Sequence, residues 1–395
     1  MPGPLQQLRD LWVLAPAQRD HYPAVRISLG VAVPLLLLLL SGQVQLTLFV
    51  IFGTFTGLYG RHEPWRQRLW HQLCGGLMLV LGVALGLWLA HLRVTPLESV
   101  GVVAGVSTLL APLTLWLGLR PAGAVFAVFA VGTLSQLPGL PTLGLWLTAA
   151  SALWCLLLGV AGALYSRRVR PEELQPHPRD SHPPAGLLHF GLRHGLALVL
   201  AGTVSVWVGL GHNDWAMAAA AAVLGVLGQQ VRIQRAWQRI LGTLGGVVLA
   251  AGLLLLDLPA AASVALVIAL QFAAQLYIVR NYAVGLLFIT PLALIMSHLA
   301  RPGPVALLLE TRLLETIIGA LSALVLVLLM PYRPPPEPGD EPGSEATPSP
   351  PELAARPLGS RFCQAAFTLR RLPRLRPGAT PAGRPAGSRV RGTAH

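Results

Sequence analysis

Arginines at helical spacing are the most chemically distinctive feature of this sequence. Arg232, Arg235 and Arg239 recur three and four residues apart, so one helix can carry all of them on neighbouring positions of its surface. Gly242 and Gly246 follow, four residues apart, which allows another helix to approach closely. This pattern indicates either a basic vestibule that attracts anions or a signal for topology and lipid anchoring. The spacing alone leaves both interpretations open.

Other arginines stand at the starts of apolar runs. Arg26 and Arg193 each open such a run, and 193 minus 26 places them 167 residues apart. Arginine suits anion contacts because its guanidinium donates several hydrogen bonds in a fixed geometry. We therefore predict that the anion contacts of a binding site come from Arg26, Arg193, Arg232, Arg235, Arg239 and Arg280.

Four polar side chains interrupt runs that are otherwise apolar, where such groups are costly in lipid. Gln271 and Gln275 are four residues apart, so they either line a polar path or hydrogen-bond between helices. Arg312 and Glu315 are one helical turn apart, so they either pair and hold the last helix in place or bind an ion. We predict that these four residues form a polar path or an intramembrane pair.

Catalytic constellations are absent from the sequence. His62 and Glu63 lack the second histidine that a zinc-binding helix needs, and His189 and His194 are five residues apart and do not share a helix face well. Neither a phosphate-binding loop nor a dinucleotide-binding glycine motif occurs. We therefore expect no enzyme, no metal site and no cofactor.

The composition identifies the elements that must position these residues. Hydrophobic residues make up 54% of the chain and charged residues only 11%, whereas soluble domains have roughly 25% charged residues. The net charge of +13 is carried by arginines in short segments between apolar runs, which favours a membrane protein over a nucleic-acid-binding one. We predict an all-α, polytopic protein of the membrane.

The apolar runs are long enough for about twelve transmembrane helices, since roughly 20 residues cross the hydrocarbon core. Turn signals such as Pro138-Gly139 and Pro302-Gly303 separate them. The predicted spans are 23–41, 44–60, 72–92, 98–118, 121–137, 142–165, 187–209, 213–229, 239–257, 259–278, 282–299 and 310–331.

The arginines also predict the orientation of the spans. With the N-terminus in the cytoplasm, the outer segments contain only Arg93, Arg301 and Arg312, and the remaining arginines near the spans fall on the cytoplasmic side. An even number of spans then places both termini in the cytoplasm. We predict a multi-pass protein of the bacterial inner membrane, in contact with its lipids.

The two halves of the sequence share landmarks. Residues 65–69 followed by Gly75 correspond to residues 236–240 followed by Gly246. Each predicted half contains six spans, so the two halves have the same orientation and form parallel repeats, an arrangement known in transporters. The predicted organisation is a first six-helix repeat (1–165), a linker (166–186), a second six-helix repeat (187–332) and a Pro/Arg-rich, mostly disordered tail (333–395).

Three segments of the second half resemble the fusaric acid resistance (FUSC) family. They are Ala236–Gly246, Tyr277–Tyr282 leading into Phe288–Leu294, and Arg312–Gly319. The first half resembles the family less closely. Larger members of the family carry sizeable cytoplasmic domains, and here the short linker and the tail stand in their place.

The resemblance implies a function in transport. Such proteins are similar to aromatic carboxylic acid efflux pumps and, more distantly, to plant malate channels. The expected function is therefore the export of organic anions, aromatic carboxylates in particular, and the plant channels suggest a homodimer by analogy. The alternative is a membrane protein that does not transport but binds anionic lipid or an envelope partner. We expect no nucleic acid partner.

Overall fold

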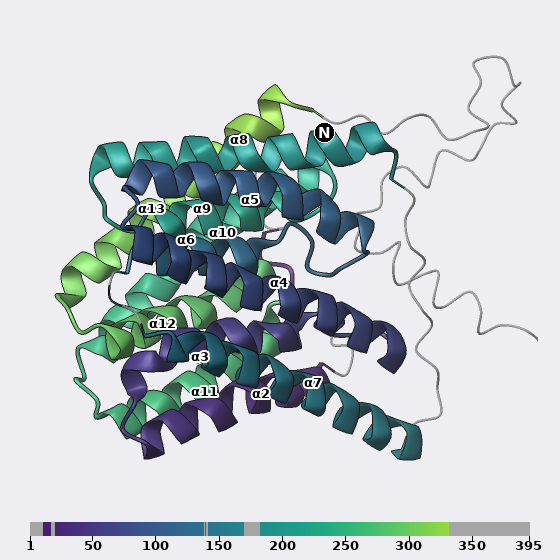
Figure 1. Ribbon diagram of the computed structural model, residues 1–395, viewed down its shortest axis with the longest axis vertical. Coiled ribbons are helices and arrows are strands. Elements are labelled where there is room, and N and C mark those ends of the chain that lie inside the picture. Colours follow the sequence, from purple (N-terminus) through teal and green to yellow (C-terminus); the bar gives the residue numbers. More distant parts are fainter. Residues whose placement is uncertain (1–10, 17–19, 138, 140, 170–181, 332–395) are drawn as a thin grey trace, which may run out of the picture. The chain divides into compact units, whose positions relative to one another are not determined.

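The computed structural model describes residues 11–16, 20–137, 139, 141–169 and 182–331, and the regular structure in these ranges is entirely helical, as predicted. Figure 1 shows the helices running roughly parallel to one another. The first half contains α2 (His21–Leu40), α3 (Thr47–Thr54), α4 (Trp65–Leu92), α5 (Pro96–Trp116), α6 (Val125–Ser135) and α7 (Leu143–Val169). The second half contains α8 (Pro184–Val208), α9 (Asn213–Leu224), α10 (Gln229–Leu254), α11 (Ala260–Tyr277), α12 (Tyr282–Ala300) and α13 (Val305–Leu329). The predicted tail and most of the predicted linker lie outside the described residues.

Nine helices in the described ranges are long and apolar enough to cross a membrane. A chain with this many such helices is a multi-pass membrane protein, as the composition predicted. The nine are α2, α4, α5, α7, α8, α10, α11, α12 and α13.

Twelve complete spans are not confirmed, because three of the predicted spans form short helices. The predicted spans 44–60, 121–137 and 213–229 correspond to α3, α6 and α9, which have 8, 11 and 12 residues. At about 1.5 Å per residue, even α9 is much shorter than a hydrocarbon core of about 30 Å. The helix α9 ends at Leu224, and α3 is extended only by short 3-10 helices on either side, Val44–Leu46 and Phe55–Leu58.

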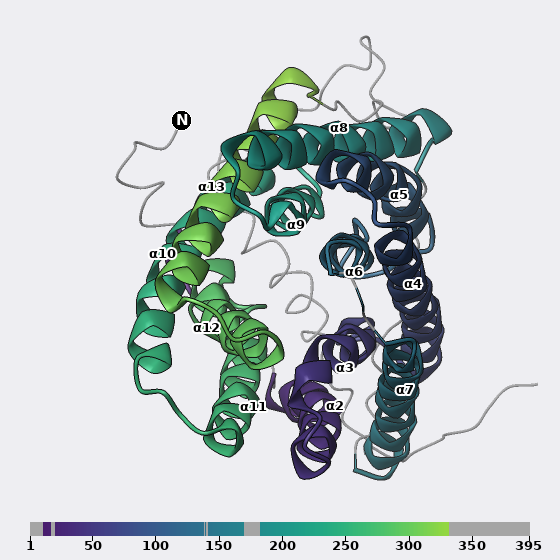
Figure 2. The same cartoon turned by 60° about the vertical axis from the view of Figure 1, so that its left-hand side comes forward.

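The short helices lie in the interior of the helix assembly (Figure 2). α6 packs against α4 and α9, and α9 packs against α8 and α13 as well. Every side chain of α9 except that of Ala222 is buried. Irregular backbone is tolerated at membrane depth where protein surrounds it. The short helices are therefore compatible with the membrane because the longer helices shield their ends from lipid.

Local sequence signals explain several helix starts. Thr95 and Glu98 form a reciprocal capping box at the start of α5, which satisfies two backbone N–H groups. Asn281 caps α12 through its Oδ1, which accepts a hydrogen bond from the Val284 N–H at 3.1 Å. Asp214 and Asn213 do not cap α9: both residues lie in its first turn, and no side chain caps this helix.

Glycines allow the short helices α3 and α9 to pack closely against a long helix. Gly319 of α13 lies against the backbone oxygen of Ala216 in α9, and a Cβ atom would collide with it. Gly53 of α3 lies in the same way against the backbone of Thr148 in α7. Small residues at such contacts let helix backbones approach closely in membranes.

The helices of the two halves make corresponding contacts. α4 packs against α6 and α7, and α10 packs against α12 and α13. α3 packs against α7, and α9 packs against α13. Between the halves, α5 packs against α8 and α2 packs against α11.

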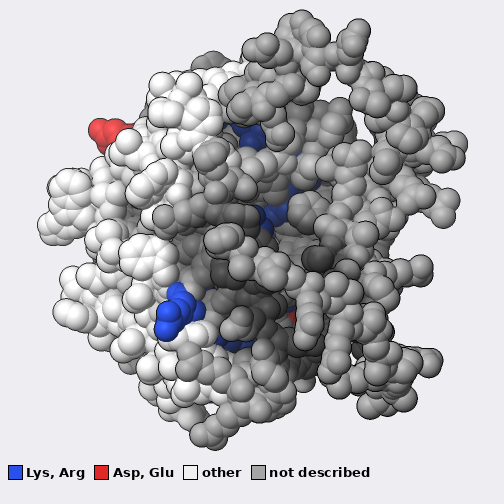
Figure 3. All heavy atoms as spheres, turned by 90° about the vertical axis from the view of Figure 1, so that its right-hand side faces the viewer, with Lys and Arg blue, Asp and Glu red and all other residues white. Residues whose placement is uncertain are grey.

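One end of the assembly, here called the basic end, contains the segments around residues 11–15, 59–64, 117–124, 225–232 and 275–281. Contacts between these segments define it: Arg61 hydrogen-bonds Gln275, and Gln238 hydrogen-bonds the backbone of Leu11. Figure 3 faces this end and shows several separate groups of blue basic side chains. The other end, here called the opposite end, contains the capping box of α5 and the starts of α9 and α13.

Candidate functional site

Buried charged and polar side chains form a line through the second half, here called the polar line. Five of them are arginines, and only two are carboxylates. Helices α8, α9, α10, α12 and α13 supply its members. Its members are Asp214, Glu315, Arg312, Arg239, Tyr282, Arg235, Arg232 and Arg193, of which Arg235 is partly buried and the others are buried.

The two carboxylates lie towards the opposite end. Asp214 is buried, its Oδ2 accepts a 2.6 Å hydrogen bond from Thr133, and its Oδ1 lies 3.8 Å from Nδ1 of His212. Glu315 is fully buried, and its Oε1 accepts a 2.5 Å hydrogen bond from the Ser205 hydroxyl. Its Oε2 has no hydrogen-bond partner among the described residues.

Arg312 lies beside these carboxylates without a direct ion pair to either of them in the described part of the chain. Its guanidinium carbon lies 5.0 Å from the centre of the Trp215 ring, and its Nε has no hydrogen-bond partner among the described residues. Glu315, Asp214 and Arg239 are all within electrostatic range of it. The predicted Arg312–Glu315 pair therefore shares a site, but Glu315 hydrogen-bonds Ser205 instead of Arg312.

Tyr282 joins two arginines in the middle of the polar line. Arg239 donates a 2.6 Å hydrogen bond to the Tyr282 hydroxyl. Arg235 places its guanidinium carbon 3.9 Å from the centre of the Tyr282 ring and donates to the backbone oxygen of Ala222. Tyr282 thus presents its ring to one cation and its oxygen to another.

The polar line reaches the basic end at Arg232 and Arg193, both of which are buried and within electrostatic range of each other. Arg232 lies 5.9 Å from the centre of the Phe190 ring, and Arg193 donates to the backbone oxygen of Met330 at 3.2 Å. His194 is fully buried next to them, and its Nε2 has no hydrogen-bond partner among the described residues.

The first half has a separate group of polar residues, here called the first-half cluster. Glu63, Arg68, His71 and Gln72 are buried, and Arg26 and Arg61 are partly buried. Nδ1 of His71 lies 2.6 Å from a carboxylate oxygen of Glu63. Arg68 donates to the backbone oxygen of Gly159 at 2.8 Å, and Arg61 donates to the Gln275 side chain at 2.6 Å. Burial lowers the pKa of Arg61 to about 10, and the negative charge of Asp20 opposes this shift.

The predicted anion contacts do not form one site. Arg26 lies in the first-half cluster, within electrostatic range of Arg61 and Arg68. Arg280 is apart from the polar line: its Nε donates to the backbone oxygen of Ala15, and its guanidinium lies 5.8 Å from the Tyr277 ring. The structure groups the other four, Arg193, Arg232, Arg235 and Arg239, along the polar line.

The two predicted glutamines have different surroundings. Gln275 is buried and accepts hydrogen bonds from Arg61 through its side chain and its backbone oxygen, so it links the two halves. Gln271 is also buried, one helical turn earlier in α11.

Sequence reasoning missed Asp214, Tyr282 and His194 as members of a site. Asp214 follows Asn213 at the start of an apolar run, where a polar residue is common, and His194 does not share a helix face with His189. Tyr282 stands in an apolar run and gives no signal of its own. A buried charge beside an aromatic residue, as in Asp214-Trp215, was the signal available for the first of them.

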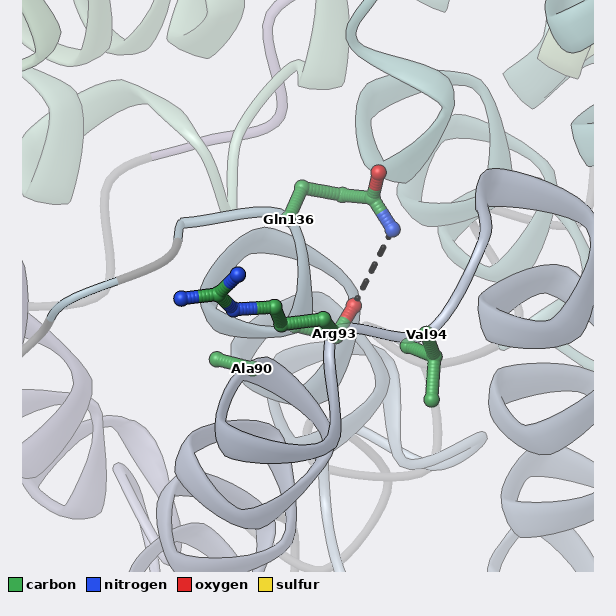
Figure 4. A pocket seen from close by; sticks show the side chains of 5 residues that line it. Ala90, Arg93, Val94 and Gln136 are labelled. Carbon is green, nitrogen blue, oxygen red and sulfur yellow. Dashed lines mark hydrogen bonds between the residues drawn. The ribbon is translucent and has the colours of Figure 1, made fainter.

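A pocket opens at the opposite end, between the end of α4 and the end of α6 (Figure 4). Ala90, Arg93, Val94, Ser135 and Gln136 line it. Gln136 donates to the Ser135 hydroxyl at 3.4 Å, and Ser135 also hydrogen-bonds Ser99. Within the described residues, no group of three His, Cys, Asp or Glu side chains could hold a metal ion.

Comparison with known proteins supports the predicted resemblance in the second half. Residues 199–326 match the family model described as fusaric acid resistance protein-like. The resemblance to this family is therefore confirmed for this stretch, which contains most of the polar line. Arg193 lies just outside it.

The chain is also similar to the uncharacterized membrane protein YvaC of Bacillus subtilis (strain 168), with 34% identity over 143 residues. The similarity covers 35% of this chain and 22% of that protein, so the chain matches about a fifth of this relative's length. No solved structure matches the chain.

Proposed function

We propose that this protein is a transporter that exports organic anions, aromatic carboxylates in particular, across the bacterial inner membrane. The observation that carries the proposal is the charge of the polar line. Its five arginines and two carboxylates leave a net positive charge among membrane-spanning helices. Buried charges in a membrane mark ion and substrate pathways because they are costly unless something neutralises them.

The neighbours of these arginines favour an aromatic anion. Trp215, Tyr282 and Phe190 each lie within 6 Å of an arginine guanidinium, at 5.0, 3.9 and 5.9 Å. An aromatic carboxylate offers a negative group for the guanidinium and a ring that packs against these side chains. The unpartnered Nε atoms of Arg312, Arg239 and Arg232 are donors available for such a ligand within the described residues.

The family match supports transport because it covers the segment that contains most of the polar line. Residues 199–326 include Asp214, Arg239, Tyr282, Arg312 and Glu315. The matched model is named for resistance to fusaric acid, itself an aromatic carboxylic acid. Export of a related compound is therefore the function we propose for this chain.

We further propose that the protein consists of two parallel six-helix repeats with both termini in the cytoplasm. The corresponding contacts within the two halves support the duplication, as do the reciprocal contacts of α5 with α8 and α2 with α11. The arginines of the basic end support a cytoplasmic location for that end. A homodimer remains a prediction by analogy.

The test uses purified protein in proteoliposomes with a panel of aromatic carboxylates loaded inside. We expect efflux of at least one acid above that from protein-free vesicles, and no efflux of benzamide, which has the ring without the charge. Substitution Arg312→Gln should reduce efflux, whereas Arg93→Gln, which replaces an exposed arginine at the same end, should not. Efflux equal to that of empty vesicles for the whole panel would contradict the proposal.

The alternative role, binding of anionic lipid or an envelope partner without transport, rests on the predicted basic tail. Removing residues 333–395 tests it separately. Loss of lipid or partner binding with unchanged efflux would assign the binding to the tail, and transport to the helices.

A further inference from the structure

Two carboxylates lie together inside the membrane-spanning helices at the opposite end. Asp214 is 2% exposed and Glu315 is 0% exposed. Each is within electrostatic range of the other. Two negative charges in a medium of low polarity repel strongly, and a proton on either carboxyl removes this repulsion.

Glu315 has few contacts that stabilise a charge. Its Oε1 accepts a hydrogen bond from the neutral Ser205 hydroxyl, and the backbone N–H of Ala216 also interacts with the carboxylate, whereas Oε2 has no full hydrogen-bond partner among the described residues. No arginine lies within ion-pair distance of it in the described part of the chain. A buried carboxylate that is neither paired nor fully hydrogen-bonded favours its neutral form.

The charged and titratable groups around Glu315 come from four helices and the turns beside them, and Arg301, just after α12, is within electrostatic range of His212. Asp214 and His212 belong to α9 and the turn before it, and Arg312 precedes Glu315 on α13 itself. Arg239 of α10 and Tyr282 of α12 face Arg312 and complete the surroundings. Ser205 of α8 contributes no charge. Arg312 thus lies between the two carboxylates on one side and the arginines of the polar line on the other.

His212 connects this buried pair with solvent. It lies outside the spanning helices, its side chain is 46% exposed, and its Nδ1 is 3.8 Å from Asp214. The hydrogen-bonding and charge of Asp214 raise the pKa of His212. His212 also stacks on Trp215, with 4.5 Å between the ring centres. An exposed imidazole in this position can pass protons between the aqueous phase and Asp214.

We infer that Glu315 and Asp214 form a proton-binding site, loaded through His212 from the opposite end, and that its protonation makes Arg312 available to an anionic substrate. The part of this inference that concerns anion binding rests on the proposed function, whereas the proton-binding site does not depend on it. When Glu315 is ionised, its charge partly neutralises Arg312. When Glu315 is protonated, the positive charge of Arg312 is free to attract a carboxylate.

The chemical step is a simple proton transfer. The imidazolium of His212 gives one proton to the Asp214–Glu315 pair, a carboxylate becomes a carboxyl group, and the neutral imidazole takes a proton from a hydronium ion of the aqueous phase, which leaves water. Because coupling between two ligands is reciprocal, binding of an anion must also promote uptake of the proton.

Calorimetry on the purified full-length protein tests this reciprocity with benzoate as the probe anion. Titrations in two buffers that differ in ionisation enthalpy give the number of protons taken up for each benzoate bound. We expect net proton uptake at neutral pH in the wild type. Glu315→Gln should bind benzoate with no uptake and with an affinity that no longer depends on pH. Asp257→Asn, an exposed acidic residue, should behave as the wild type.

Infrared difference spectroscopy tests the proton site without any anion. A carboxyl C=O band that appears on acidification in the wild type and is missing in Glu315→Gln is the expected result. Its absence at every pH from about 5 to 9 would overturn the inference. Benzoate binding without proton uptake would also overturn the inference, as would a benzoate affinity that depends on sodium concentration instead of on pH. In these cases anion efflux by the wild type would still support the proposed function, whereas a titrating band in a protein without efflux would contradict only that function.

Discussion

The polar line and the first-half cluster use the same residue type in different surroundings. Arg68 and Arg61 donate to a backbone carbonyl and a side-chain amide on neighbouring helices. Arg232 and Arg312 instead lie over aromatic rings, and neither has a carboxylate within ion-pair distance in the described residues. The Nε atoms of all four arginines lack a partner among the described residues, so the difference lies in the rest of each guanidinium. A guanidinium that donates to protein carbonyls joins helices, whereas one that lies over aromatic rings can bind a ligand.

This comparison extends to the carboxylates. In the first-half cluster, a carboxylate oxygen of Glu63 lies 2.6 Å from Nδ1 of His71, and Glu63 is within electrostatic range of Arg68. In the polar line, Glu315 has the neutral Ser205 hydroxyl and the backbone N–H of Ala216 as its partners, and no cation within ion-pair distance among the described residues. The first half therefore has the features of a scaffold, and the second half has those of a binding site.

The largest expected effect is a loss of transport activity in the variant Arg239→Gln. Removal of a buried charge that contacts an anion typically costs about 2–5 kcal/mol, which corresponds to roughly a thirtyfold or greater loss. Initial efflux rates in proteoliposomes measure it. The matched variant Arg68→Gln should retain flux within about twofold per folded molecule. Equal losses in both variants would remove the distinction between the two regions.

Arg68→Gln should instead affect stability. Its hydrogen bond to the Gly159 carbonyl joins α4 to α7, and hydrogen bonds of charged groups contribute about 1.5–3 kcal/mol. Thermal unfolding in detergent, followed by tryptophan fluorescence, should show a lower Tm. Arg66→Gln, an exposed position in the same helix, serves as the control and should have a Tm close to that of the wild type.

Glycine substitutions test whether the two halves pack alike. Gly319→Ala and Gly53→Ala both place a methyl group against the backbone of a neighbouring helix, so each should lower the stability by about 1–3 kcal/mol. Gly105→Ala, where nothing lies within 4 Å of the added carbon, should be neutral or slightly stabilising. A loss of stability in only one of the two variants, Gly319→Ala or Gly53→Ala, would show that the two halves do not depend on equivalent packing.

The smallest effect concerns His212, whose pKa is raised in the folded protein by Asp214. Folding therefore favours the protonated form, and this stabilisation is complete below a pH of about 6.5 and is lost as the pH rises through the raised pKa. Because the side chain is partly exposed, we expect less than about 1 kcal/mol. The Tm difference between the wild type and His212→Gln should be larger at low pH than at high pH, whereas His91→Gln, an exposed histidine, should give a difference that is independent of pH.

Much of the fold could be predicted from hydropathy. The predicted span 282–299 agrees closely with α12, because its apolar run has clear stops on both sides. The predicted span 213–229 was wrong as a complete helix, since α9 ends at Leu224 and the chain then passes through the glycines Gly225 and Gly228. Hydropathy could not reveal this because buried short helices and complete spans have equally apolar residues.

The site was predicted only in part. The arginines at helical spacing in α10 were recognised, but the prediction joined Arg26 and Arg280 to them, and both lie elsewhere. Equivalent positions in two halves suggested a common site for Arg26 and Arg193. In the structure each of them lies with the arginines of its own half, because α2 and α8 pack against different partners.

The sequence by itself determined that this protein is helical and crosses the membrane many times, because hydropathy is a sum over neighbouring residues and needs no knowledge of contacts. Its arginines, glycines and prolines also indicated where helices begin and end. Only the tertiary structure decided which polar groups meet. Ser205 and Glu315 are 110 residues apart, and Arg239 and Tyr282 are 43 apart. Such distant residues share a site only when their helices pack with a particular rotation and depth, and this depends on the close contacts of many side chains at once.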